Sequence, residues 1–106
     1  MNKDLEYILK EADNLKISHK IMNDNAGKSI YGRYIPENDT IYINPAISNT
    51  EQCKTFIHEM YYHLAYINDD DLCEAQDEWF SDQLAKVAYE RYGEHIDSYL
   101  TKRGLK

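Results

Sequence analysis

The sequence predicts a single α+β domain over residues 1–106. Three observations predict it. Apolar residues near the N-terminus recur at helical spacing, and short runs rich in Ile and Tyr between residues 17 and 44 are separated by turn residues. Helical spacing then returns after residue 48. The composition, 42% hydrophobic and 29% charged, is that of a globular chain.

The N-terminal half predicts one helix followed by a sheet. Asp4 caps a helix that carries Leu5, Ile8 and Leu9 on one side and ends near Asn14. Strands are expected over residues 17–22, 29–35 and 40–44, with turns over 23–27 and 36–39. Because the strands follow one another through short turns, we expect a three-stranded antiparallel meander.

The C-terminal half predicts two long helices and a short one. Ser48 and Glu51 form a capping box that opens the first, whose core positions are Cys53, Phe56, Ile57, Met60, Leu64 and Ile67. Asp71 and Glu74 open the second, which carries Trp79, Phe80, Leu84, Val87 and Ala88 on one side. Gly93 is a C-cap, and a short helix is expected over residues 94–103.

Charge and cysteine content narrow the class of protein. A formal charge of −7 and a pI near 4.9 argue against direct binding of nucleic acid, which needs clustered Lys and Arg, and favour a basic protein partner. No apolar run is long enough to span a membrane, so a cytoplasmic location is expected. Cys53 and Cys73 are expected to be reduced core residues.

The stretch with a chemical signature is Thr55 to Leu64, which nearly matches the zinc-protease motif His-Glu-x-x-His. His58 and Glu59 fit the motif as zinc ligand and catalytic base, but Tyr62 stands where the second histidine belongs. Residues four apart on a helix lie about 40° from each other around its axis, and residues five apart about 140°. His63 therefore cannot join His58 on one ion from an undistorted helix.

This pattern leaves several possibilities open. The site can be an intact zinc centre, a weakened one in which Tyr62 or a carboxylate assists His58, or a scaffold without catalysis. His63 can pair with Glu59, which lies four residues before it, or can simply be a packed side chain.

A run of acids follows this helix. Asp69, Asp70, Asp71 and Glu74 suit a helix N-terminus, where the helix dipole favours negative charge. They also suit an acidic face that docks on a basic or nucleic-acid-binding protein.

Three segments together resemble the ImmA/IrrE-like metallopeptidases, in particular the compact versions from phages and mobile elements: Gly32-Arg33-Tyr34, residues 40–45, and the helix from Phe56 to Leu64. The resemblance implies a zincin-like fold and a zinc endopeptidase that cleaves or antagonises a DNA-binding repressor. It makes His58 the first zinc ligand, Glu59 the base and Tyr62 the altered second ligand, with His63 as the extra histidine that many members carry.

The third ligand of this family is an acid on the following helix. Glu78 is the candidate here, and Glu74, one turn earlier, is the second choice. Because one ligand is replaced, zinc is not expected to bind tightly.

Two functional hypotheses result. In the first, a phage or mobile-element protein with a degenerate, inactive peptidase scaffold binds and inhibits a protein partner, either a repressor or a nucleic-acid-binding host defence factor. In the second, the chain is an active zinc endopeptidase that cleaves a DNA-binding repressor.

Overall fold

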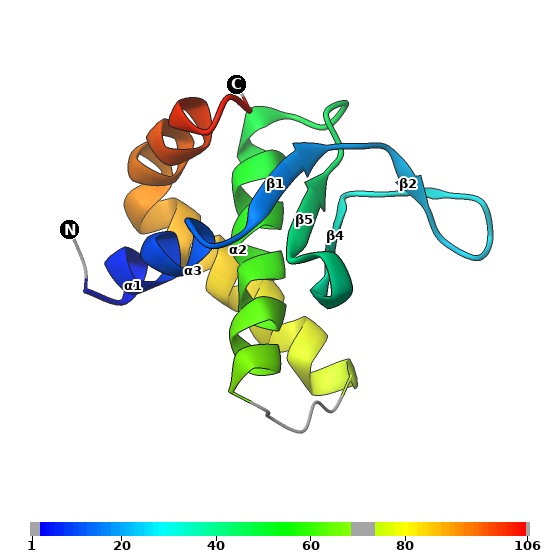
Figure 1. Cartoon of the computed structure of the whole chain (residues 1–106), viewed down its shortest axis with the longest axis horizontal. Helices are drawn as coiled ribbons and strands as arrows, with labels where there is room; N and C mark the ends of the chain where they lie inside the picture. The colour runs from blue at the N-terminus through cyan, green and yellow to red at the C-terminus, as the bar shows by residue number, and fades with distance from the viewer. Residues whose placement is uncertain (1–2, 69–73, 106) are drawn as a thin grey trace.

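The structure is a computed structural model that describes residues 3–68 and 74–105, with the side chains of the last helix described from residue 78 (Figure 1). It is an α+β arrangement, as predicted. The elements are α1 (Lys3–Ala12), β1 (Lys16–His19), β2 (Met22–Asn23), β3 (Ser29–Ile30), β4 (Gly32–Ile35), the 3-10 helix η1 (Pro36–Asn38), β5 (Thr40–Ile43), α2 (Asn49–Ile67) and α3 (Glu74–Lys102).

The main sheet differs from the predicted antiparallel meander. Its strand order is β1-β5-β4, with β5 antiparallel to β4 but parallel to β1. The last strand occupies the centre because it is the most apolar: Thr40, Ile41 and Ile43 are all buried. The expected strand over residues 17–22 divides into β1 and β2, and β2 pairs with β3 in a separate hairpin. The prediction failed because residues 16–19 and 40–43 pair across a long sequence separation, which local turns do not encode.

Helix α2 is the centre of the molecule, since it contacts β4 and β5 on one side and α3 on the other (Figure 1). It begins where predicted, with the Ser48 hydroxyl accepting a 3.2 Å hydrogen bond from the Glu51 backbone N–H. Four of its six predicted core residues are fully buried with Ile41 and Ile43, namely Cys53, Phe56, Ile57 and Met60. Leu64 is partly buried against the core, whereas Ile67, at the end of α2, is exposed.

Helix α3 turns a different face to the core from the one predicted. Trp79, Phe80, Leu84 and Val87 are exposed; of the predicted positions Ala88 is buried, and the small side chains of Ser81 and Ala85 are buried with it. Small residues at a helix contact allow two axes to approach closely, so α3 lies near α2 along this stretch. The hydrophobic spacing of α3 did not predict the buried face, because apolar residues lie on two sides of the helix and only the side with the smaller residues packs against the core.

The predicted break at Gly93 corresponds to a kink inside α3. Tyr92 has non-helical angles of φ −134° and ψ 24°, and the chain then resumes a helix to Lys102. Shortly after the end of α3, Gly104 has a φ of +81°, the left-handed conformation that glycine adopts at helix C-termini.

Two other predictions concern single residues and segments. Cys53 is buried in the core, as expected, and Cys73 lies outside the described residues. Within the described ranges, none of the helices has the length and apolarity needed to cross a membrane.

Candidate metal centre

The predicted face of α2 presents His58 and Tyr62 on the same side, one turn apart. Their ring centroids are 5.3 Å from each other. This placement follows from the four-residue spacing, which puts both side chains on one face of a helix.

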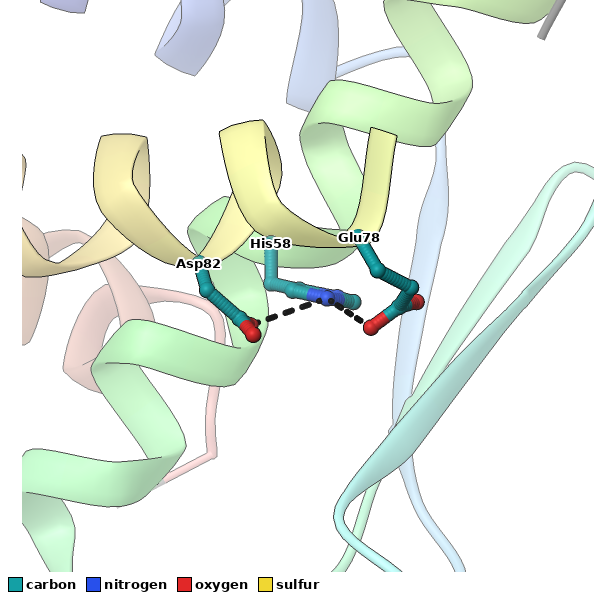
Figure 2. A group of neighbouring side chains, drawn as sticks. All are labelled: His58, Glu78 and Asp82. Atoms are coloured by element: carbon teal, nitrogen blue, oxygen red, sulfur yellow. Dashed lines mark hydrogen bonds and ion pairs between the residues drawn. The ribbon is translucent and has the colours of Figure 1, made fainter. Parts of the chain in front are cut away.

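Two carboxylates from α3 approach His58. Its Nε2 lies 3.3 Å from Oε2 of Glu78 and 3.2 Å from Oδ1 of Asp82, and Figure 2 shows the imidazole between the two acids. One ligand atom from each of the three residues lies within 4.8 Å of the others, so this group could hold a metal ion. Glu78, the third ligand implied by the sequence resemblance, is therefore next to His58.

Asp82 is the member that the sequence analysis did not single out. It lies four residues after Glu78, so the two carboxylates share one face of α3. That spacing was a signal present in the sequence, but it becomes meaningful only once the face of α3 that meets His58 is known.

Glu59 is buried beside this group, with 6% of its surface exposed. Its Oε2 lies 3.5 Å from Nδ1 of His58, too far for a strong hydrogen bond, and has no hydrogen-bond partner. A buried carboxylate oxygen without a partner is costly and is commonly explained by a water or an ion that is not shown.

Tyr62 is engaged with the same acid as His58. Its phenol donates a 2.6 Å hydrogen bond to Oε1 of Glu78. Burial, and then the neighbouring carboxylate of Glu78, raise the pKa of Tyr62 well above its ordinary value. In this arrangement Tyr62 thus acts as a hydrogen-bond donor that holds Glu78.

The pKa of His58 reflects the same surroundings. Partial burial lowers it, but the carboxylates of Glu59, Glu78 and Asp82 together outweigh the burial and raise it above its ordinary value. Without a metal, ion pairs between the protonated His58 ring and the three carboxylates account for their closeness. A bound cation would take the place of the His58 proton among the same carboxylates.

His63 is not part of this group. It is buried between α1 and β4, with Nδ1 3.0 Å from the Tyr34 hydroxyl and Nε2 3.5 Å from Oε2 of Glu11. Its assignment as a possible metal ligand, and its possible pairing with Glu59, are not supported by these contacts. The physical reason is the one-residue offset, which turns His63 to another side of α2.

The predicted acidic docking face cannot be placed. Asp69, Asp70 and Asp71 lie outside the described residues, and Glu74 is described only as the first residue of α3. Glu74, the second choice for the third ligand, therefore remains a sequence prediction.

The group of His58, Glu78 and Asp82 lines a cleft of about 640 Å³. One wall is the segment from Ile30 to Arg33, and the other is α3 around Glu78 to Lys86. The strand can lie this close to α2 because Gly32 has no side chain: a Cβ there would stand 2.5 Å from Cγ2 of Thr55 and 2.6 Å from the Tyr42 carbonyl oxygen. Three cationic side chains, those of Arg33, Lys54 and Lys86, also line the cleft.

Comparison of the chain with known protein families, curated proteins and solved structures finds no match. What the chain does must therefore be inferred from the residues themselves.

Proposed function

We propose that the protein is a metal-dependent hydrolase of the zinc-peptidase type, with an irregular ligand set of His58, Glu78 and Asp82. The observation that carries this proposal is the convergence of three donor atoms in the lining of a cleft, beside a buried carboxylate with an oxygen that makes no hydrogen bond. Catalytic zinc sites use three protein ligands and leave a fourth position open. Asp82 supplies the donor that the replacement of the second histidine by Tyr62 had removed from the motif.

The donor spacing supports zinc. Ligand atoms about 2.0–2.2 Å from a tetrahedral zinc ion lie about 3.3–3.6 Å from one another. The separations from Nε2 of His58 to the nearest oxygens of Glu78 and Asp82 are 3.3 and 3.2 Å. Imidazole and carboxylate are also a donor set that zinc commonly accepts in hydrolytic enzymes.

The residues have separate roles in this proposal. His58, Glu78 and Asp82 hold the ion, which when bound supplies Lewis-acid polarisation of a substrate carbonyl. Glu59 is placed to accept a proton as general base, because its Oε2 makes no hydrogen bond and lies beside the group, 3.5 Å from Nδ1 of His58. Tyr62 fixes Oε1 of Glu78, so that Oε2 of the same carboxylate faces His58.

Metal content tests the proposal. The purified protein incubated with zinc should hold near-stoichiometric metal by elemental analysis, and His58→Ala or Asp82→Asn should weaken zinc binding at least about tenfold. His95→Ala and Glu90→Gln are matched controls on the exposed surface of α3 and should leave zinc binding unchanged. If the wild-type chain binds no zinc, the proposal is wrong.

Activity requires a separate measurement. Cleavage of a quenched fluorescent peptide library should depend on zinc and should be lost in Glu59→Gln, while that variant still binds the metal. The resemblance noted in the sequence makes a DNA-binding repressor the substrate to try first.

A second candidate function is the inhibitory binding protein. The hydrogen bond from Tyr62 to Glu78 favours the inhibitory binding protein, because it occupies one carboxylate oxygen of a proposed metal ligand. A scaffold that holds no metal can keep this contact. The formal charge of −7 favours a basic or nucleic-acid-binding partner, such as a host defence factor.

Absence of zinc and of peptidase activity, together with capture of such a partner, would support this second candidate. Charge reversal at Asp69, Asp70, Asp71 and Glu74 should then abolish binding without changing the circular dichroism spectrum. Unchanged binding by the charge-reversed variant would exclude that acidic face as the docking site.

A further inference from the structure

A second hollow lies beside the metal-binding cleft. Its volume is about 240 Å³, and its lining residues are Arg33, Tyr34, Pro36, Glu59, Tyr62 and Tyr66. Arg33 and Glu59 also line the larger cleft, so the two spaces adjoin at these residues. Neither the motif nor the metal ligands assign a role to this hollow.

The hollow is lined mainly by aromatic rings, and the hydroxyl groups of two of its tyrosines make hydrogen bonds to residues outside the hollow. The Tyr34 hydroxyl lies 3.0 Å from Nδ1 of His63, and the Tyr62 hydroxyl donates to Glu78. Their rings, and not their hydroxyl groups, are therefore what these two residues can offer to an occupant. Tyr66 stands edge-on to Tyr34, with centroids 6.2 Å apart, and remains 59% exposed. Such a ring gains stabilisation when another apolar group covers it.

Strand β4 connects the two spaces. The larger cleft is lined by the chain from Ile30 to Arg33, and the hollow by the chain from Arg33 to Pro36. In the described sheet β4 is an edge strand, paired only with β5. The Tyr31 carbonyl accepts from Asn44 N–H at 2.8 Å, so by antiparallel alternation the backbone groups of Gly32 and Tyr34 face outward.

We propose that the hollow is a specificity pocket for a large apolar side chain of an extended peptide that lies along the outer edge of β4. Main-chain hydrogen bonds to Gly32 and Tyr34 would position the peptide, as in other cases of strand addition. The side chain that enters between Tyr34, Tyr62 and Tyr66 would place the neighbouring peptide bond over the cleft. This inference rests on the proposed function only in taking the cleft as a site for peptides.

An apolar occupant fits better than a charged one. Tyrosine rings together with Glu59 could attract a lysine or arginine side chain. Arg33, however, lines the same hollow and would repel a cation, and a cation on Glu59 would block the proposed base. An acidic side chain would have to approach the Glu59 carboxylate, which is equally unfavourable.

Binding of a matched peptide series tests the proposal. The probes are capped, fluorescently labelled peptides of alternating Ser and Thr that differ only at the central residue, which is Phe, Leu, Ala, Lys or Asp. Anisotropy titrations use the full chain with EDTA present, so that no turnover occurs. Burial of a large apolar side chain should make the Phe and Leu peptides bind about tenfold or more tighter than the Ala peptide.

Variants of exposed tyrosines identify the pocket. Tyr66→Ala should remove most of the preference for Phe over Ala, whereas Tyr7→Ala, a matched change of an exposed tyrosine on α1, should preserve it. Equal binding of all peptides, no binding of any, a preference for Lys or Asp, or an unchanged preference in Tyr66→Ala would each overturn the proposal.

The test is independent of the metal. Loss of the peptide preference with zinc binding intact would overturn the specificity pocket alone. A preserved preference in a chain that binds no zinc would overturn the hydrolase alone.

Discussion

The phenol of Tyr62 on α2 and the carboxylate of Glu78 on α3 are joined by a hydrogen bond of 2.6 Å, while the other oxygen of Glu78 faces His58 at 3.3 Å. One acid thus links the altered position of the motif to the retained histidine. Tyr62 therefore holds the Glu78 carboxylate in place beside His58.

Tyr62→His should increase zinc affinity by at least about tenfold, because it adds an imidazole one turn from His58 and beside Glu78. Competition with a zinc-binding dye measures the change. Tyr61→His places the same side chain on a neighbouring position of α2 and should have no comparable effect. Equal affinities for the two variants would show that the Tyr62 position does not face the ion.

Gly32→Ala should destabilise the fold by about 1–3 kcal/mol, because the new methyl group meets Thr55 and the backbone of Tyr42. Urea unfolding followed by circular dichroism measures the loss. Ser29→Ala, on the exposed part of β3, is the control and should change stability little. A neutral result for Gly32→Ala would mean that β4 and α2 can separate without cost.

Arg103→Ala should cost about 2 kcal/mol of stability. The guanidinium donates to the Ala12 carbonyl at 2.9 Å and to the Leu15 carbonyl at 2.6 Å, and the variant leaves both acceptors without this partner. Thermal unfolding should show a clear fall, and Arg103→Lys should recover only part of it, since an ammonium lacks the planar fork. Arg91→Ala, an exposed arginine of α3, should behave like the wild type.

Stability should fall between pH 10 and 12 in a way that depends on Tyr99. Burial, followed by the hydrogen bond to Asp13, raises the pKa of Tyr99 to about 12. An unfolded tyrosine ionises near pH 10, whereas the folded one stays protonated until about pH 12. The stabilisation of the fold by the protonated Tyr99 hydroxyl is therefore complete below pH 10, and it is lost as the pH rises through the pKa of Tyr99 in the folded chain.

Urea midpoints measured at the two ends of that range test this dependence. The wild-type midpoint should fall more than that of Tyr99→Phe, and Tyr7→Phe should follow the wild type. The same decrease in Tyr99→Phe and in the wild type would contradict the assignment to Tyr99.

Local signals in the sequence predicted the parts of the fold that depend on nearby residues. The Ser48 cap, the buried stripe of α2 and the shared face of His58 and Tyr62 follow from spacing and capping alone. The family resemblance also selected Glu78, which the structure brings to His58.

The parts that were not predicted depend on contacts between distant segments. The parallel pairing of β1 with β5, and the burial of Ser81 and Ala85 where Trp79 and Phe80 were expected, are set by how the layers pack. Asp82 became a candidate ligand only when that face was known. Conversely, the extra histidine of the motif, His63, is a buried residue beside Tyr34 and Glu11.

The contacts of Arg103 constrain how the chain can fold during synthesis. They connect it to carbonyl groups 91 and 88 residues earlier, at the end of α1 and just before β1. While the chain is still on the ribosome, the N-terminal helix and the first strand cannot gain these contacts until the last turn of α3 has emerged. The end of α1 and the start of β1 are therefore anchored only after residue 103 has been made, and until then the nascent chain must hold the apolar face of α1 without these contacts.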